Sequence, residues 1–172
     1  MKANLSNVAK HFFPNPSLEM VYFEAIANSI DAEATEISIN IKIKSFAEVD
    51  TFKLEISDNG IGFTDENFRK FSILMENESE SHKGLGRLVY LSYFNKVEVS
   101  SSYEGNTRFF TLSDAFDGEN NVNDTPLNKS ITKLNFTGYT KDKIKSYDYL
   151  KPVSLKKSIE EHFYPLFYTL KS

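Results

Sequence analysis

The sequence predicts an α+β domain, a two-layer sandwich in which helices pack on one face of a mixed, mostly antiparallel sheet. Residues 36–44 and 51–57 alternate apolar and polar side chains, as half-buried strands do. Residues 96–103 and 107–113 flank the tripeptide EGN, which is a hairpin signal, and residues 131–139 have a further strand pattern. Helical patterns precede, separate and follow these strands, which favours one layer of each kind.

Four segments have the pattern of helices. We expect helices over residues 15–32, 64–74, 85–94 and 154–170. Asn15 or Ser17 can cap the first helix, and Pro165 is expected to kink or end the last one. The polar segments 75–84 and 114–130 have little periodicity, so we expect loops there.

Length and composition restrict the class of protein before any motif is considered. The 172 residues predict a single domain with a core over about residues 15–140 and a helical extension over 141–172, as the whole protein or as the first domain of a longer one. The net charge of −4 does not favour nucleic acid as a partner, although a lysine-rich segment after residue 140 leaves a local basic contact open. The absence of cysteine excludes disulfides and thiolate zinc sites. No run of ~20 apolar residues is present, so we expect no membrane span and a cytoplasmic protein.

The first candidate site is a polar face on the helix expected over 15–32. Glu24, Asn28 and Asp31 lie within ~60° of one another, at ~100° per helical residue. A solvent-exposed stripe is the simpler interpretation. The functional alternative is that Glu24 activates water as a general base, while the carbonyl oxygen of Asn28 holds a hard cation such as Mg²⁺, which prefers oxygen ligands.

The second candidate is the segment DNGIG, which directly follows a predicted strand. Asn-Gly is a common turn dipeptide, and a turn is the simpler interpretation. A turn alone does not require the second glycine, Gly62. A carboxylate fixed at the strand end, Asp58, can accept a hydrogen bond from an exocyclic amine, and neighbouring glycines let a flat ring approach the backbone. The segment therefore also fits an adenine pocket.

The third candidate is the segment HKGLGR, which precedes an apolar helical pattern. Backbone N–H groups at a helix N-terminus bind phosphate, and Gly84 and Gly86 allow a close approach. Lys83 and Arg87 add positive charge. An ordinary helix start explains this pattern about as well, so the third candidate is weak by itself.

Taken together, in this order and spacing, the three segments resemble the GHKL superfamily, which groups gyrase B subunits, heat-shock chaperones, sensor histidine kinases and mismatch-repair ATPases around one ATP-binding fold, the Bergerat fold. EAIANSIDA resembles its first motif, DNGIGF its second, and KGLGRL the glycine motif at the end of a mobile lid. SITKLNF is similar to a last motif in which a strand threonine, here Thr132, supports the adenine site. The resemblance covers roughly residues 17–137.

The resemblance implies a role for each matched residue. Glu24 would activate the attacking water, Asn28 would bind Mg²⁺, and Asp58 would accept a hydrogen bond from the adenine amine. Residues 75–86 would form the ATP lid. The remaining residues expected at the nucleotide are Asp31, Gly60, Gly62, Lys83, Gly84, Leu85, Gly86 and Thr132.

The implied function is Mg²⁺-dependent ATP binding with slow hydrolysis in a nucleotide-gated conformational module. Two alternatives stay open, namely an ATP-binding switch without turnover and phosphotransfer to a histidine of a partner chain. We expect a partner protein or a second domain, with a homodimer as a further option. His82 stands where kinases of the superfamily usually carry another glycine, so the resemblance does not fix the geometry of the lid.

Overall fold

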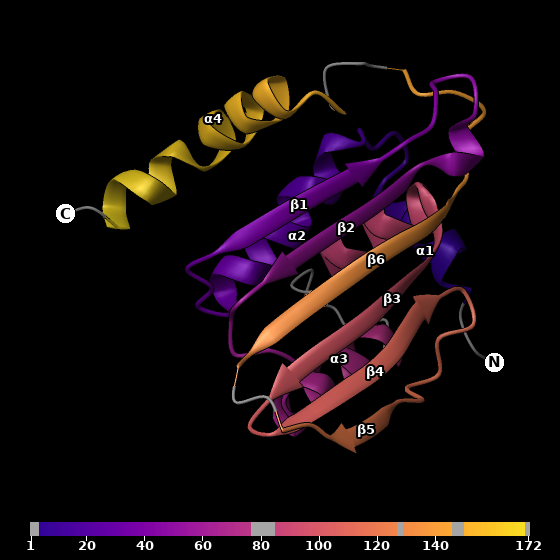
Figure 1. The fold of residues 1–172 in the computed structure, drawn as a ribbon. Helices are drawn as coiled ribbons and strands as arrows, with labels where there is room; N and C mark the ends of the chain where they lie inside the picture. Colours follow the sequence, from indigo (N-terminus) through magenta and orange to yellow (C-terminus); the bar gives the residue numbers. More distant parts are fainter. Residues whose placement is uncertain (1–3, 77–84, 127–128, 146–149, 171–172) are drawn as a thin grey trace.

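The centre of the fold is a six-stranded antiparallel sheet (Figure 1). The computed structural model describes residues 4–76, 85–126, 129–145 and 150–170. The strands are β1 (Ile37–Lys42), β2 (Lys53–Asp58), β3 (Phe94–Tyr103), β4 (Asn106–Ser113), β5 (Asn121–Asp124) and β6 (Ile131–Tyr139). The helices are α1 (Leu5–Phe12), α2 (Glu19–Asp31), α3 (Asp65–Glu76) and α4 (Pro152–Leu170), with 3-10 helices η1 (Val49–Thr51) and η2 (Leu85–Ser92). The strand order is β1-β2-β6-β3-β4-β5, and the predicted α+β class is confirmed.

Apolar and polar residues alternate along the strands, so the apolar side chains gather on one face of the sheet and form the core. Leu54 and Ile56 of β2, Val97 and Val99 of β3, and Phe136 of β6 are all buried. Phe136 pairs with Leu54 on one side and with Val97 on the other, so their side chains pack across three neighbouring strands. Burial of this apolar face against the helices is the main source of stability in such a layer.

The same alternation positions polar residues at one end of the core face. Asp58 follows Ile56 by two positions and Thr132 precedes Leu134 by two, so both polar side chains point toward the helices. Asp58 pairs with Thr132 between β2 and β6, and Thr132 pairs with Ser101 between β6 and β3. Three neighbouring strands therefore each present one polar side chain at the same end of the sheet.

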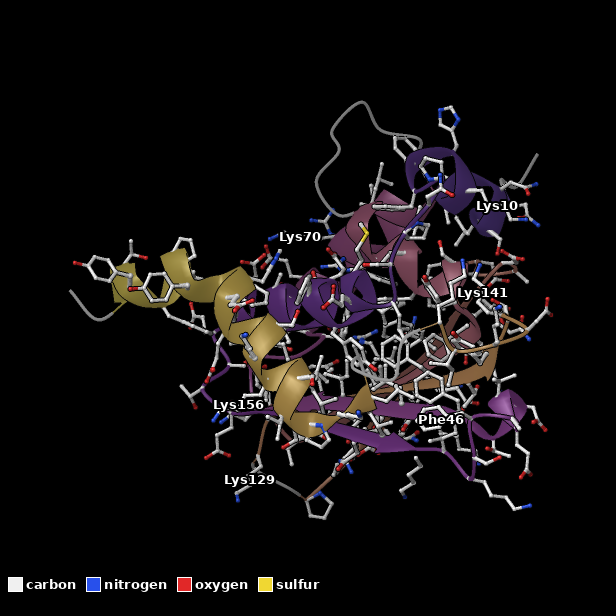
Figure 2. All side chains as sticks on the ribbon, turned by 90° about the horizontal axis from the view of Figure 1, so that it is seen from above. Lys10, Phe46, Lys70, Lys129, Lys141 and Lys156 are labelled. Carbon is white, nitrogen blue, oxygen red and sulfur yellow. The ribbon has the colours of Figure 1, made fainter. Side chains whose placement is uncertain are left out.

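Helices α1, α2 and α3 cover one face of the sheet and lie behind it in Figure 1. Figure 2 shows the two layers from above, with Lys70 on the helical layer and Phe46 beside the strands. Helix α2 buries Val21, Tyr22 and Ala25 in the common core. The helices thus form the second layer of the predicted sandwich.

Helix α4 lies beside the β1 edge of the sheet, and its second half extends away from the other elements (Figure 1). It contacts α2 through a hydrogen bond from Ser158 Oγ to Glu19 Oε1 at 2.5 Å. The rings of His162 and Phe23 stack with centroids 3.9 Å apart. Pro165 lies inside the helix, which continues beyond it, so the proline does not end α4. Among the described residues, none of the helices has the length and apolar character needed to cross a membrane.

Two helices differ from their predicted form. Helix α2 begins at Glu19 after Leu18, without a side-chain cap, and not at Asn15 or Ser17. The carbonyl of Pro16 instead accepts a hydrogen bond from Tyr93 Oη at 2.7 Å, which ties the preceding segment to the end of η2. The buried helix expected over 85–94 is the 3-10 helix η2, and its last predicted residue is the first of β3.

Three elements were absent from the sequence prediction, namely the single turn η1, helix α1 and strand β5. The short helix α1 is capped by Asn4, whose Oδ1 accepts a hydrogen bond from Asn7 N at 3.0 Å. Strand β5 lies inside the segment 114–130, which was expected to be a loop. All side chains of β5 are exposed, so the strand has no apolar alternation and is defined only by its pairing with β4.

Candidate functional site

One cavity of about 620 Å³ lies between the helical layer and the polar end of the strands. Its lining includes most of the predicted site residues, namely Glu24, Asn28, Asp31, Asp58, Gly62, Gly86 and Thr132. Gly60 and Leu85 are their chain neighbours but do not line the cavity. Lys83 and Gly84 lie outside the described residues, as does most of the predicted lid. The fold therefore brings residues of all the proposed motifs to one cavity.

Glu24 and Asn28 form a hydrogen-bonded pair one turn apart on α2. Asn28 Nδ2 donates to the Glu24 carbonyl at 2.7 Å and to Glu24 Oε1 at 3.0 Å. Both side chains are half-buried, whereas Asp31 at the end of the helix is exposed. The simpler interpretation, a solvent-exposed stripe, therefore describes Asp31 but not the pair.

Arg87 of η2 binds the other end of the Asn28 amide. Its Nε and Nη2 donate to Asn28 Oδ1 at 3.2 and 3.0 Å, and its guanidinium carbon lies 5.3 Å from the centre of the Phe71 ring. Tyr90 Oη accepts a long hydrogen bond of 3.4 Å from Asn28 Nδ2. Burial, and to a smaller extent the Glu24 carboxylate, raises the pKa of Tyr90 far above its ordinary value, so this residue stays a neutral phenol.

Gly86 contacts Glu24 so closely that any larger residue would require the Glu24 carboxylate to move. A Cβ atom placed on Gly86 would overlap the Glu24 carboxylate. The backbone of η2 thus lies directly against the carboxylate, with no side chain between them. Leu85 points the other way and is 6% exposed in the core, so it anchors η2 and does not face the cavity.

Asp58 is held in one orientation by two donors. Its Oδ2 accepts a hydrogen bond from Ser29 Oγ at 3.0 Å, and its Oδ1 accepts one from Gly60 N at 2.9 Å. The segment after Asp58 packs on the end of α2, because Ile61 N donates to the Ala32 carbonyl at 2.9 Å. A Cβ on Gly60 would lie 2.5 Å from that same carbonyl oxygen, which explains the glycine.

Gly62 lies against the side chains of β3 and β6. Ser101 Oγ and Thr132 Oγ1 are buried and hydrogen-bonded to each other at 2.9 Å. The amide of Phe63 donates to Ser101 Oγ at 2.8 Å. Gly62 has a φ of +76°, and a Cβ there would lie 2.6 Å from Ser101 Oγ. Glycine is therefore required both by the backbone conformation and by the close approach.

A buried arginine fixes the next residue of this segment. Arg108 of β4 is 4% exposed, and its Nε donates to the Phe63 carbonyl at 2.9 Å. Its Nη2 donates to Tyr103 Oη at 2.8 Å and pairs with Asp65 at the start of α3. Both backbone groups of Phe63 are thus held by side chains of the sheet.

Four further residues of the site were not predicted from the sequence, namely Ser29, Tyr90, Ser101 and Arg108. Ser29 does have a sequence signal, since it is a polar residue at helical spacing from the buried Ala25. Ser101 likewise continues the period of two set by the buried valines of β3. For Arg108 the sequence has no such signal, because its role depends on contacts between distant segments.

Gly62→Ala is expected to lower the free energy of unfolding by about 2–4 kcal/mol, since a left-handed backbone is unfavourable for alanine and the new methyl group overlaps Ser101. Urea denaturation measures this change. Gly105→Ala is the matched control, because Gly105 has a similar φ of +77° but the nearest atom to its Cβ, the carbonyl oxygen of Thr125, would lie 3.8 Å away. Equal losses in the two variants would contradict the close approach at Ser101.

The fold and the cavity together define a class, a two-layer α+β domain with a ligand-sized cavity between its layers. A family model described as "Histidine kinase-, DNA gyrase B-, and HSP90-like ATPase" matches residues 16–144, more than half of the chain. The chain belongs to this family and is a GHKL-type ATPase domain. Members of this superfamily typically bind ATP with Mg²⁺.

Two solved structures have a similar fold. The 43K ATPase domain of Thermus thermophilus gyrase B, solved in complex with an aminocoumarin, is 21% identical with a TM-score of 0.47, over 69% of this chain and 32% of that one. The ATPase region of Saccharomyces cerevisiae topoisomerase II is 14% identical with a TM-score of 0.47, over 70% of this chain and 37% of that one. The matched part thus spans about a third of each relative. A comparison with curated proteins finds no match.

Proposed function

We propose that the chain binds ATP together with Mg²⁺ in this cavity and hydrolyses it slowly, as a nucleotide-gated conformational module. The observation that carries the proposal is that Glu24 and Asn28 line the same cavity as Asp58. The volume of about 620 Å³ is in the ordinary range of small-molecule sites. The family match supports ATP as the ligand.

The Asp58 end of the cavity suits adenine. Ser29 and Gly60 hold the carboxylate in place, and it can accept a further hydrogen bond from the exocyclic amine of the base. Gly62 and Thr132 line the same end with little bulk, so a flat ring can lie against them. Apolar side chains of β3, β4 and β6 also line the cavity and offer contact to the ring faces.

The Glu24–Asn28 end suits phosphates and a cation. Asn28 Oδ1 is the oxygen that would hold Mg²⁺, and one amide ligand fits an ion that usually keeps several waters and phosphate oxygens. When bound, Mg²⁺ would neutralise charge on the phosphates. Gly86 has no side chain, so the backbone of η2 can lie directly against Glu24 at this end of the cavity. Asp31 would support the site from its exposed position on the cavity lining.

Glu24 is proposed as the general base for the attacking water. Its Oε1 accepts the hydrogen bond from Asn28, which orients the carboxylate on the cavity lining. Lys70 and Arg87 also line the cavity, but Lys70 pairs with Glu66 at 2.7 Å and Arg87 binds Asn28. Arg87 would have to leave Asn28 before it could stabilise charge in the transition state, and we expect this additional step to keep hydrolysis slow.

The test compares ATP binding with phosphate release for the purified chain, with Mg²⁺ and with EDTA. We expect saturable ATP binding by calorimetry and a phosphate release that depends on Mg²⁺. A parallel preparation of Glu24→Gln controls for contaminating ATPases. Binding without release would contradict hydrolysis and favour the switch, labelled phosphate on another chain would favour phosphotransfer, and absence of nucleotide binding would refute the proposal.

A further inference from the structure

We propose that Arg87 is a phosphate-responsive latch on Asn28, which holds the Asn28 side-chain oxygen until the phosphates of a nucleotide draw the guanidinium away. The inference rests on the proposed function of the cavity and adds a residue that distinguishes nucleotides from nucleosides. It follows from the partners of a single amide group and from the charges around it.

The Asn28 amide is fully engaged in this structure. Its nitrogen donates to the carbonyl and carboxylate oxygens of Glu24, and this fixes which way the amide faces. Its Oδ1 accepts two hydrogen bonds from the guanidinium of Arg87. A cation on Oδ1 would compete with these two donors and would lie next to a fixed positive charge. Arg87 and Mg²⁺ are therefore alternative partners of the same oxygen.

Arg87 is the lining cation best suited to move. Among the described residues it forms no ion pair, whereas Lys70 is paired with Glu66. Its hydrogen-bond acceptor is a neutral amide, and its side chain lies over the Phe71 ring on the cavity lining. A guanidinium binds phosphate through charge-assisted, paired hydrogen bonds, which are stronger than bonds to a neutral oxygen. Phosphate oxygens in the cavity would therefore displace Asn28 as its acceptor.

The movement of Arg87 from Asn28 to phosphate couples the binding of phosphates to the binding of a cation at Asn28. Release of Arg87 frees Asn28 Oδ1 for a cation at the moment when phosphate oxygens are present to complete the cation's ligands. A nucleoside lacks the phosphates and leaves the latch on Asn28. Arg87 should therefore contribute to ATP affinity and contribute nothing to adenosine affinity.

The test measures affinities of ATP and of adenosine in EDTA by calorimetry, so that no metal contributes. Arg87→Gln should weaken ATP binding by about tenfold and leave adenosine binding unchanged. Arg87→Lys should restore part of the loss, because it keeps the charge but not the paired donors. Arg69→Gln, on the exposed side of α3, is the matched control and should change neither affinity.

A second readout follows the latch itself by ¹⁵N NMR. The Nε–H signal of Arg87, identified by its loss in Arg87→Gln, should shift on addition of ATP in EDTA and stay in place with adenosine. An unmoved signal with ATP, an unchanged ATP affinity, or an equal loss for ATP and adenosine would each overturn the latch. Failure of the wild-type chain to bind either ligand would instead refute the proposed function of the cavity.

Discussion

Asp58→Asn is expected to weaken ATP binding by about 100-fold while the protein stays folded. Asparagine keeps the size of the side chain and one oxygen, which can still accept the Gly60 N–H. Its amide nitrogen replaces Oδ2 and would face the donor group of adenine, so two donors would meet in a confined site. The Ser29 hydroxyl can rotate to accept from the new amide, and thus the local fold is preserved. Calorimetry with ATP and thermal unfolding measure the two effects.

Two further variants make this result specific. Ser29→Ala removes a hydrogen bond that orients Asp58 but leaves its charge, and we expect a smaller loss of about fivefold. Asp50→Asn makes the same chemical change at an exposed carboxylate away from the cavity lining, and it should leave ATP binding as in the wild type. If Asp58→Asn binds ATP as tightly as the unaltered chain, the adenine assignment is wrong.

Glu24→Gln is expected to slow ATP hydrolysis by about 100- to 10,000-fold, the range that a general base contributes, with ATP binding retained. Glutamine has nearly the same shape, so it still fits against Gly86, and its oxygen can still accept from Asn28 Nδ2. It has no basic oxygen for the proton of the attacking water. Single-turnover phosphate release with saturating Mg-ATP measures the chemical step.

The exposed Glu36 provides the matched control for this change. Glu36→Gln removes the same charge at a site whose side chain does not line the cavity, and the rate should stay that of the wild type. Phosphate release unchanged in Glu24→Gln would rule out Glu24 as the base. Loss of ATP binding together with hydrolysis would indicate that Glu24 holds the site in shape and does not act in the chemical step.

Periodicity predicted most of the sheet, because β2, β3 and β6 alternate buried and exposed side chains in the way that a one-sided sheet requires. Strand β5 has no such alternation, and only its pairing with β4 makes it a strand. The helical spacing of Glu24 and Asn28 predicted that they lie together. Their contact with Arg87 depends on how η2 packs beside α2, and local sequence patterns do not contain that information.

Ser101 and Arg108 of the candidate site likewise could not be predicted, because local sequence patterns do not show which distant segments they contact. Ser101 meets Thr132 only because two strands pair in one register, and the register is set by the whole sheet. Arg108 reaches the Phe63 carbonyl from another strand. The sequence thus indicated which chemical groups a site of this kind needs, and the fold supplied the residues that hold those groups in position.

Because side chains of the sheet hold both backbone groups of Phe63, the two ends of the cavity differ in preorganisation. The segment beside Gly62 is already ordered, so a ring that binds there meets a rigid surface and loses little additional conformational entropy of the protein. At the other end, in the proposed latch, the Arg87 side chain exchanges Asn28 for phosphate oxygens as these bind, and only then is Asn28 Oδ1 open to a cation. We therefore expect sequential recognition, with rapid docking of the base followed by a slower rearrangement around the phosphates.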